Sequence, residues 1–323
     1  MQQALIFSLF LILILVVGIG VILISSQNYI AEARYLKGMS NLREGKYDLA
    51  AIEIRRAISL NPKLDVYWRD LSQVYFLELN NLLQREKISE ANRNKIWVLI
   101  SNSVNSAKQA TDLNPKNVSN WIVRGFILQN MIGILEGADD WAIKCYEEAK
   151  KIEDNNPFIY TQIGRSYLAK ATLVRDISEE VKREALNLAL ENFKKAIEVK
   201  SDYAPAHFQI ALTYQRMGKI DEAIAKMEEA KSLSPLDVGI AFQLGMLYWQ
   251  KEDLDKAKAE FERAVALNPN YSNARYFLGL IYDKEGRKQK AIEQFEKIAE
   301  LNPENEEVKT ILSNLREGKS AFF

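Results

Sequence analysis

Apolar residues recur along most of the chain at the spacing of amphipathic helices, and this pattern is interrupted repeatedly by proline. Leu-Asn-Pro occurs at 60–62, 113–115, 267–269 and 301–303, and Leu-Ser-Pro occurs at 233–235. Proline lacks the N–H that would continue a helix, and it disfavours helical geometry at the residue before it. The pattern therefore predicts many short helices that end at similar turns.

These interruptions keep a period of 34 residues from Pro235 to Pro269 to Pro303. Within one period a small residue is followed three positions later by Tyr, and an Ala is followed four positions later by Met or Phe. Residues three or four apart share a helix face, so each period predicts two helices that pack closely at the small residues. The positions in step are Ala211, Gly245 and Gly279; Tyr214, Tyr248 and Tyr282; Ala223, Ala257 and Ala291; and Met227, Phe261 and Phe295.

These columns resemble the tetratricopeptide repeat (TPR) family, whose unit is a 34-residue helix-turn-helix. The resemblance implies an all-α fold, a right-handed α-solenoid of about seven helix pairs. When extra residues are allowed between the two helices of some pairs, the same repeat pattern extends back to residue 31. The predicted repeats, within an array at 29–305, are 31–64, 65–117, 118–156, 157–203, 204–237, 238–271 and 272–305.

The predicted array is followed by a capping helix and tail at 306–323. Val308, Ile311, Leu312 and Leu315 form an apolar stripe on an otherwise polar segment, and Gly318 can end the helix. A terminal repeat has no neighbour to bury its apolar face, so we expect this helix to cover it.

Two repeats carry long insertions. In repeat two, the insertion runs from Phe76 to about Lys95. It keeps apolar residues at Leu79, Leu82 and Leu83, and the apolar pattern resumes at Ile88, Ile96 and Trp97, which predicts that both helices are prolonged into a projecting hairpin. In repeat four, Asp176 with Glu179 three residues later predicts the start of the second helix, with Asp176 as its cap. The insertions form either an extra docking surface or a tolerated surface elaboration.

The segment Leu5 to Ile24 contains no charge, and 17 of its 20 residues are Leu, Ile, Val or Phe. As a helix it spans about 30 Å, the thickness of a bilayer core. A cleaved signal peptide is the alternative, but the leader Met-Gln-Gln has no basic residue, and the best cleavage match, Ala31 to Ala33, lies well past the apolar run. We predict an uncleaved transmembrane anchor at 1–28. The basic residues after the span favour a cytoplasmic array by the positive-inside rule; they are Arg34, Lys37, Arg43 and Lys46.

Composition narrows the candidate chemistry. Forty-three basic residues balance forty-three acidic ones, so no net positive field favours nucleic acid as a partner. Cys145 is the only cysteine and His207 the only histidine, which excludes an internal disulfide and a zinc site built from several such ligands. We expect Cys145 to be buried and His207 to be a core or groove-edge residue. No catalytic, cofactor-binding or metal-binding constellation is predicted.

The resemblance implies that the first helices of the repeats line a concave groove for a peptide or a partner helix. Mapped position by position, the predicted binding residues are Phe208, Gln209, Leu212, Phe242, Gln243, Met246, Trp249, Tyr276, Phe277 and Leu280. Aromatic residues with nearby amides suit apolar side chains and a peptide backbone. The carboxylate-binding subset of the family needs Lys, Arg and Asn where this chain has Tyr35, Met39, Asp70, Gln73, Ser119 and Val123.

The leading hypothesis is a single-pass membrane scaffold that binds a protein partner, in bacterial cell-envelope assembly, and is not an enzyme. Segments such as GADDWAIKCYEEA are also similar to the TPR tails of bacterial O-antigen-ligase-type membrane proteins. That likeness makes an accessory subunit of a membrane glycan enzyme the second hypothesis. A catalytic protein with an unrecognised site, for which His207 is the residue to test, is the third.

Overall fold

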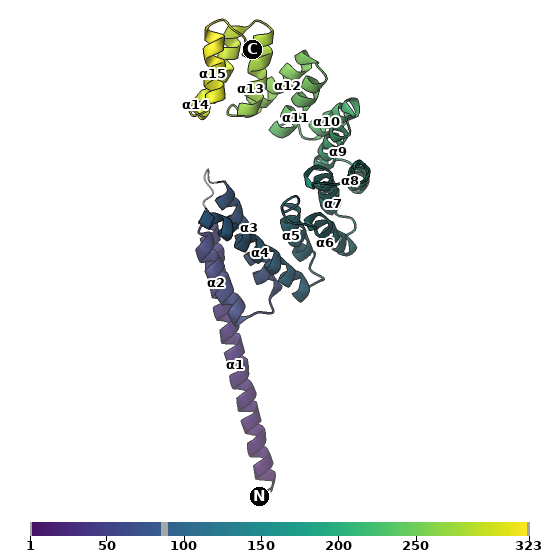
Figure 1. The fold of residues 1–323 in the computed structure, drawn as a ribbon. Helices are drawn as coiled ribbons and strands as arrows, with labels where there is room; N and C mark the ends of the chain where they lie inside the picture. Colours follow the sequence, from purple (N-terminus) through teal and green to yellow (C-terminus); the bar gives the residue numbers. More distant parts are fainter. Residues whose placement is uncertain (1, 85–89, 322–323) are drawn as a thin grey trace. The chain divides into compact units, whose positions relative to one another are not determined.

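The computed structural model describes residues 2–84 and 90–321, and within these residues the regular secondary structure is entirely helical (Figure 1). The prediction of an all-α fold is confirmed. The helices are α1 (Gln2–Arg43), α2 (Tyr47–Leu60), α3 (Asp65–Leu83), α4 (Glu90–Leu113), α5 (Val118–Gln129), α6 (Ala138–Ile152), α7 (Pro157–Leu173), α8 (Glu179–Val199), α9 (Ala204–Arg216), α10 (Ile220–Leu233), α11 (Val238–Gln250), α12 (Leu254–Leu267), α13 (Ser272–Lys284), α14 (Lys288–Leu301) and α15 (Glu306–Arg316).

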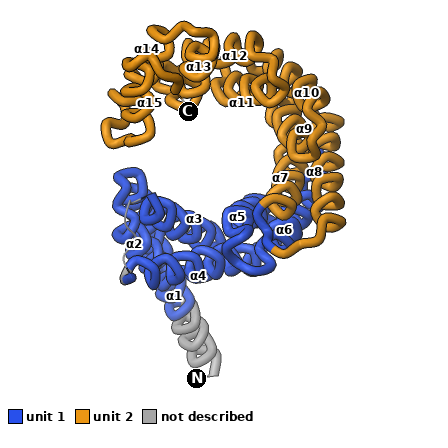
Figure 2. The backbone as a smooth tube through the Cα atoms, turned by 45° about the horizontal axis from the view of Figure 1, so that its top comes forward, with its two compact units in different colours: residues 1–155, 173–175 blue, residues 156–172, 176–323 orange. Residues whose placement is uncertain are grey.

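The helices form two compact units, which we describe separately (Figure 2). Unit 1 comprises residues 1–155 and 173–175, and unit 2 comprises 156–172 and 176–323. In both units consecutive helices pack as pairs: α1 with α2, α3 with α4 and α5 with α6 in unit 1, and α9 with α10, α11 with α12 and α13 with α14 in unit 2. Each helix pair also contacts a neighbouring pair, as a stack of repeats requires.

The glycines of the first helices are the points of closest approach within a pair. A Cβ atom placed on Gly245 would lie 2.6 Å from a ring carbon of Phe261, and one on Gly279 would lie 2.7 Å from Phe295. Because real Cβ atoms do not approach other atoms so closely, only a residue without a side chain fits there. The predicted close approach at the small residues is thereby confirmed.

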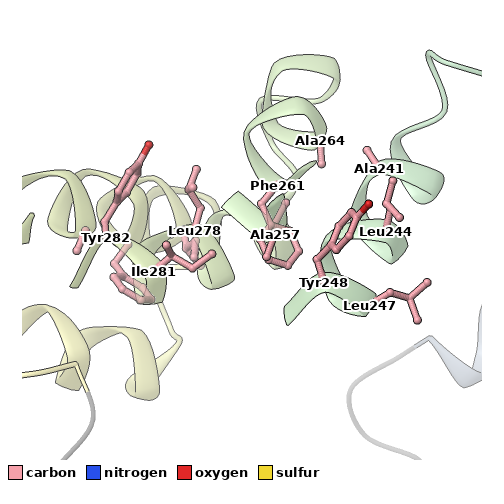
Figure 3. Packing of buried hydrophobic residues seen from close by; sticks show 14 of the residues in the cluster. Ala241, Leu244, Leu247, Tyr248, Ala257, Phe261, Ala264, Leu278, Ile281 and Tyr282 are labelled. Carbon is pink, nitrogen blue, oxygen red and sulfur yellow. The ribbon is translucent and has the colours of Figure 1, made fainter. Parts of the chain in front are cut away.

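Within unit 2, one continuous core cluster extends from α9 to the end of the described chain. Phe261 of α12 is fully buried, and Figure 3 shows it with Ala257 between the side chains of α11 and those of α13. Phe295 holds the equivalent position in α14 and is likewise fully buried. Each aromatic ring therefore serves its own helix pair and the interface with the next pair. This sharing explains why one repeat cannot bury its apolar face alone.

Hydrogen bonds from side chains hold the turns that join one repeat to the next. The indole N–H of Trp68 donates to the backbone oxygen of Pro62 at 2.9 Å, and Trp121 donates to Pro115 at 2.8 Å. Arg275 makes the equivalent bond to Pro269, at 2.7 Å. In each case the donor lies six residues after the acceptor. The turns are thus fixed by the first helix of the following repeat.

The insertion in repeat two lengthens both helices of the pair, as the apolar pattern predicts. α3 has 19 residues and α4 has 24, whereas the helices of the regular repeats have 13 or 14. Leu79 and Leu82 are buried in the prolonged part. The tip at 85–89, with Ile88, lies outside the described residues.

The insertion in repeat four starts its second helix where expected, but the predicted cap is wrong. The side-chain oxygen of Ser178, not that of Asp176, accepts the N–H of Val181 at 3.2 Å. Asp176 has a left-handed backbone with φ of 59° and so lies in the turn before the helix. A helix cap needs extended geometry at the capping residue, which Ser178 adopts.

α1 is one unbroken helix from the apolar run into repeat one (Figure 1). In its described part, Leu15–Arg43 is long and apolar enough to cross a membrane, a property that a signal sequence shares. The large apolar side chains between Leu15 and Ile24 are 49–68% exposed, so no other helix covers them. By contrast Ala31, seven residues later, is fully buried against repeat one. Within two helical turns, α1 thus changes from a solvent-exposed apolar helix to a helix packed in repeat one.

α15 covers the end of the last described pair. Val308, Ile311, Leu312 and Leu315 are all buried in the core cluster of unit 2. The N–H of Val308 is capped by the side chain of Asn305 at 3.1 Å. The apolar stripe of this helix therefore does what a capping helix must do.

Candidate functional site

The predicted binding residues lie on the first helices of three successive repeats in unit 2. All of them are half-buried, which leaves part of each side chain open to solvent. We call this surface the α9–α11–α13 face. It consists of Phe208, Gln209 and Leu212 on α9; Phe242, Gln243, Met246 and Trp249 on α11; and Tyr276, Phe277 and Leu280 on α13.

An aromatic cluster lies at the centre of this face. Phe277 stacks on the buried ring of Phe261 at 5.4 Å between centroids, and its edge meets Trp249 at 5.5 Å and Tyr276 at 5.7 Å. Phe242 lies 6.1 Å from the same ring. Such edge-to-face and offset contacts are the favoured geometry for aromatic pairs. The rings are therefore fixed in place before any partner arrives.

The same contacts show that part of the predicted face is also core. Phe242 packs against Phe261 at 5.9 Å and against Tyr271 at 5.3 Å. Phe208, Leu212, Met246 and Leu280 also pack against the core cluster of unit 2. Removing Phe242 would disturb this packing as well as the surface. Trp249 and Met246 pack against this cluster too, but they also line the cavity described next, which makes them the sharper probes of binding.

A cavity of about 560 Å³ opens beside the aromatic cluster. Met246 and Trp249 line one part, and the rest is lined by residues outside the predicted set, namely Gln250, Glu252, Leu254 and Lys284. Its lining is mixed, with three apolar side chains beside one amide, one acidic and one basic side chain. The cavity gives this face a recess next to an aromatic surface.

Of the four cavity residues outside the predicted set, Glu252 has the most unusual backbone. Its backbone is left-handed, with φ of 64°, a conformation that side chains other than glycine rarely adopt. Gly218 and Gly286 hold the equivalent turn position in the neighbouring repeats, with φ of 76° and 75°. A glutamate in a glycine column of 34-residue period is a signal that the sequence contains.

A tyrosine hydroxyl joins the face to the capping helix. Tyr276 donates to Glu307 of α15 at 2.7 Å. Burial, and then this hydrogen bond to a carboxylate, raises the pKa of Tyr276 to about 12. The side chain is therefore neutral and a hydrogen-bond donor at physiological pH. Its orientation at the edge of the face is set by α15.

The corresponding first helices of unit 1 carry a different surface. Tyr35 stacks on Tyr67 at 4.8 Å and donates to Asp70 at 2.6 Å, while Tyr67 donates to Glu32 at 2.9 Å. Tyr35 and Asp70 stand where the carboxylate-binding family members carry basic residues or amides. Here the Tyr35 hydroxyl donates to one carboxylate oxygen of Asp70, and the side chain of Arg69 pairs with the other oxygen at 3.0 Å. Neither position therefore supplies a cation for a partner carboxylate.

The single cysteine and histidine have structural surroundings. Cys145 is buried in unit 1, and burial raises the pKa of its thiol to about 11, so it is not an activated nucleophile. His207 is buried in unit 2, where its Nε2 lies 2.9 Å from the backbone oxygen of Ser201. Its Nδ1 lies 3.0 Å from Glu229. The expectation for both residues is confirmed, with His207 holding the turn before α9.

Comparison with known families assigns the repeats. Models described as tetratricopeptide repeat match residues 31–64 and, in two overlapping matches, 208–271 and 242–306. A model described as TPR repeat matches 178–218. Together these matches cover about half of the chain. The match at 31–64 has the same bounds as the first predicted repeat, which the C-terminal part of α1 forms with α2.

Solved structures share the fold at low sequence identity. A tetratricopeptide repeat protein from Parabacteroides merdae is 16% identical, with a TM-score of 0.58 over 89% of this chain and 99% of its own. PilW, described as a widely conserved type IV pilus biogenesis factor, is also 16% identical, with a TM-score of 0.52 over 76% of this chain and 96% of its own. A search of curated protein sequences gave no match.

Proposed function

We propose that this chain, which belongs to the tetratricopeptide repeat family, is a membrane-anchored adaptor that binds a protein partner through its α9–α11–α13 face. Proteins of this family are protein-interaction scaffolds. Binding at this face concentrates the partner at the membrane instead of changing it chemically. The observation that carries the proposal is the aromatic cluster of this face, half-open to solvent and adjoining a cavity of about 560 Å³.

The physical basis is preorganisation. Trp249, Tyr276 and Phe277 are held by one another, so little side-chain freedom is lost when a partner covers them. Gln209 and Gln243 add amide groups that pair with a peptide backbone. An extended segment or helix with apolar side chains, one of which enters the cavity, is the ligand that this chemistry recognises.

The membrane anchor is supported by the surroundings of Ala31. The best cleavage match, Ala31 to Ala33, lies inside repeat one, where Ala31 is buried and Glu32 accepts a hydrogen bond from Tyr67. Cleavage there would remove part of the packed helix. We therefore infer that the apolar segment is retained as a single membrane span. The basic residues that follow it favour a cytoplasmic array.

We place the partner in bacterial cell-envelope assembly. PilW, described as a pilus biogenesis factor, carries the same fold, and this likeness supports the setting by analogy alone. An accessory role beside a membrane glycan enzyme is the alternative. The identity of the bound partner separates the two.

Site-specific crosslinking in native membranes tests the binding face. A photoreactive amino acid at Met246 should give a discrete adduct with a partner, whereas one at the exposed Ala259 on α12 should not. Trp249→Ala should abolish the Met246 adduct without changing the helix content. Equal crosslinking from both positions, or an adduct that is indifferent to Trp249→Ala, would show that partners do not use this face.

A further inference from the structure

We propose that the turn edge of repeats one and two lies on the lipid surface, with Lys63 and Lys116 at the level of the lipid phosphates. The turn edge consists of the turns at 61–64 and 114–117, which join α2 to α3 and α4 to α5. The inference rests on the proposed anchor and adds the orientation in which the first repeats are held. All of the residues involved lie in unit 1.

The first step is the absence of a linker between the apolar run and repeat one. α1 is continuous through this region, and only six residues, 25–30, separate Ile24 from the buried Ala31. Six helical residues span about 9 Å. The headgroup layer on one side of a bilayer is roughly 5–8 Å thick. Repeat one therefore begins where the lipid headgroups end, and its direction is set by the same helix.

The second step places the turn after α2 at this level. The side-chain amide of Asn61, at the end of α2, donates to the side-chain oxygen of Asn28 on α1 at 3.3 Å. Asn28 lies four residues beyond Ile24, which is about 6 Å along the helix. Pro62 and Lys63 follow Asn61 and are exposed. This turn thus reaches the depth of the headgroups.

The third step links the next turn to the first. Asp65, at the start of α3, accepts hydrogen bonds from Asn117 at 2.9 Å and from Asn120 at 2.7 Å. These bonds span more than fifty residues of sequence and join the turn at 114–117 to the start of α3. The bonds hold the Asp65 carboxylate against the two amides, on the side of the start of α3. Lys116 is exposed in the joined turn.

The composition of the equivalent turns supports a lipid contact in the first two repeats alone. The residue after the closing position of each turn is Lys63, Lys116, Asn155, Asp202, Leu236, Asn270 and Glu304 in chain order. It is basic only in the two turns nearest the anchor. Neither lysine makes an ion pair with any residue of 15–84 or 92–321. Basic side chains at this depth attract anionic lipid headgroups.

The tryptophans follow the same distribution. The side chain that donates to the turn is Trp68 in repeat two and Trp121 in repeat three, but His207 and Arg275 in later repeats. Both indoles are half-exposed. Tryptophan is enriched at membrane interfaces because its ring is apolar and its N–H is polar. Lysine and tryptophan thus occur together at the turn edge only next to the anchor.

The opposite edge of the same repeats faces away from the lipid. The turn between α1 and α2 contains Lys46, and it follows Arg43 at the far end of α1. Arg43 is fifteen residues beyond Asn28, or about 22 Å. Gln84 caps the C-terminal end of α3, opposite the end that starts beside Asn61. Lys46 and Gln84 are therefore matched controls for Lys63 and Lys116.

Fluorescence quenching by lipid-bound nitroxide tests this orientation. The full chain, with Cys145→Ala to remove its only cysteine, is placed in vesicles containing phosphatidylglycerol and a lipid with a nitroxide on its headgroup. Single labels are introduced through Lys63→Cys, Lys116→Cys, Lys46→Cys and Gln84→Cys. We expect loss of most of the fluorescence at positions 63 and 116 and little loss at 46 and 84.

Flotation of the vesicles separates failure of the anchor from failure of the orientation. A chain that does not float with vesicles overturns both the anchor and this inference. A chain that floats but whose label at 63 is quenched no more than its label at 46 overturns the orientation alone. In a chain labelled at position 63, Lys116→Glu should reduce the quenching, while Lys46→Glu should not. An unchanged signal in the first variant would remove Lys116 from the lipid contact.

Discussion

At the scale of single residues, two kinds of backbone position matter: glycines at close helix contacts, which the fold requires, and left-handed turn positions, one of which borders the cavity. Glycines such as Gly164 and Gly245 let an aromatic ring of the partner helix lie against bare backbone, at distances no side chain tolerates. The turn glycines Gly218 and Gly286 supply a left-handed conformation, and Glu252 adopts the same conformation without being glycine. The first kind is a packing requirement. The second, at Glu252, is local strain beside a cavity.

Gly245→Leu should destabilise the array by about 1–3 kcal/mol or more, because the new side chain overlaps the ring of Phe261. Chemical denaturation followed by circular dichroism measures this loss. Ala259→Leu adds a leucine at an exposed position on α12 and should change the stability little. Similar effects from the two substitutions would contradict the close approach.

Glu252→Gly should stabilise unit 2 by about 1 kcal/mol, because glycine adopts the left-handed conformation without the steric cost that Glu252 bears. The reverse change at the equivalent turn, Gly286→Glu, should destabilise by a similar amount. Thermal unfolding of both variants provides the comparison. If Glu252→Gly also weakens partner binding, the strained glutamate serves the binding site. If Glu252→Gly instead lowers the stability of unit 2, the turn at Glu252 is not strained.

At the scale of helices, tyrosine hydroxyls bonded to carboxylates connect one element to the next. Tyr248 of α11 donates to Glu228 of α10 at 3.0 Å, and Tyr282 of α13 donates to Glu262 of α12 at 2.8 Å. Tyr276 makes the corresponding bond from α13 to α15. Burial first, and then the carboxylate partner, raises the pKa of each tyrosine to about 12.

These bonds predict a stability loss at high pH. An unfolded tyrosine has a pKa of about 10, so folding favours the protonated form and its contribution is complete below pH 10. The contribution is lost as the pH rises from 10 through 12. Denaturation midpoints measured across this range should fall less steeply in Tyr276→Phe than in the parent. An identical slope in both proteins would show that this tyrosine does not titrate with unfolding.

At the scale of the molecule, the apolar segment and the array share one helix instead of being joined by a linker. Unit 1 therefore includes the end of the apolar segment, and the first repeat needs residues that precede Arg34: Ala31 is buried and Glu32 bonds to Tyr67. The α9–α11–α13 face belongs to unit 2. In the proposed function, membrane attachment and partner binding are thus carried by different units.

Two truncations test this arrangement. A chain beginning at Ser25 should leave the membrane but keep the stability of repeat one, because every buried contact of that repeat is retained. A chain beginning at Arg34 should lose at least about 1 kcal/mol, through the Glu32–Tyr67 bond and the packing of Ala31. Hydrogen exchange over 34–64 measures both. Equal protection in the two chains would reopen the possibility of cleavage near Ala33.

The helix pairs, their turns and the small-residue contacts were predictable because they are written in local patterns: a 34-residue period, proline at the turns, and glycine opposite phenylalanine. The start of α8 was predicted, but its cap was wrong, because Asp176 and Ser178 are both good capping residues and only the backbone angles distinguish them. Local propensity cannot choose between two capping residues that lie two positions apart. The path of the chain in the folded structure selects Ser178.

The sequence by itself determined the all-α fold, the family and the apolar segment, since periodicity and hydropathy depend only on the order of residues. Only the tertiary structure decided that Phe242 is partly core, that Glu252 borders a cavity, and that Asn28 meets Asn61 just beyond the apolar segment. These facts depend on which side chains meet across helices far apart in the chain. Such contacts follow from packing in three dimensions, and a pattern along one dimension does not contain them.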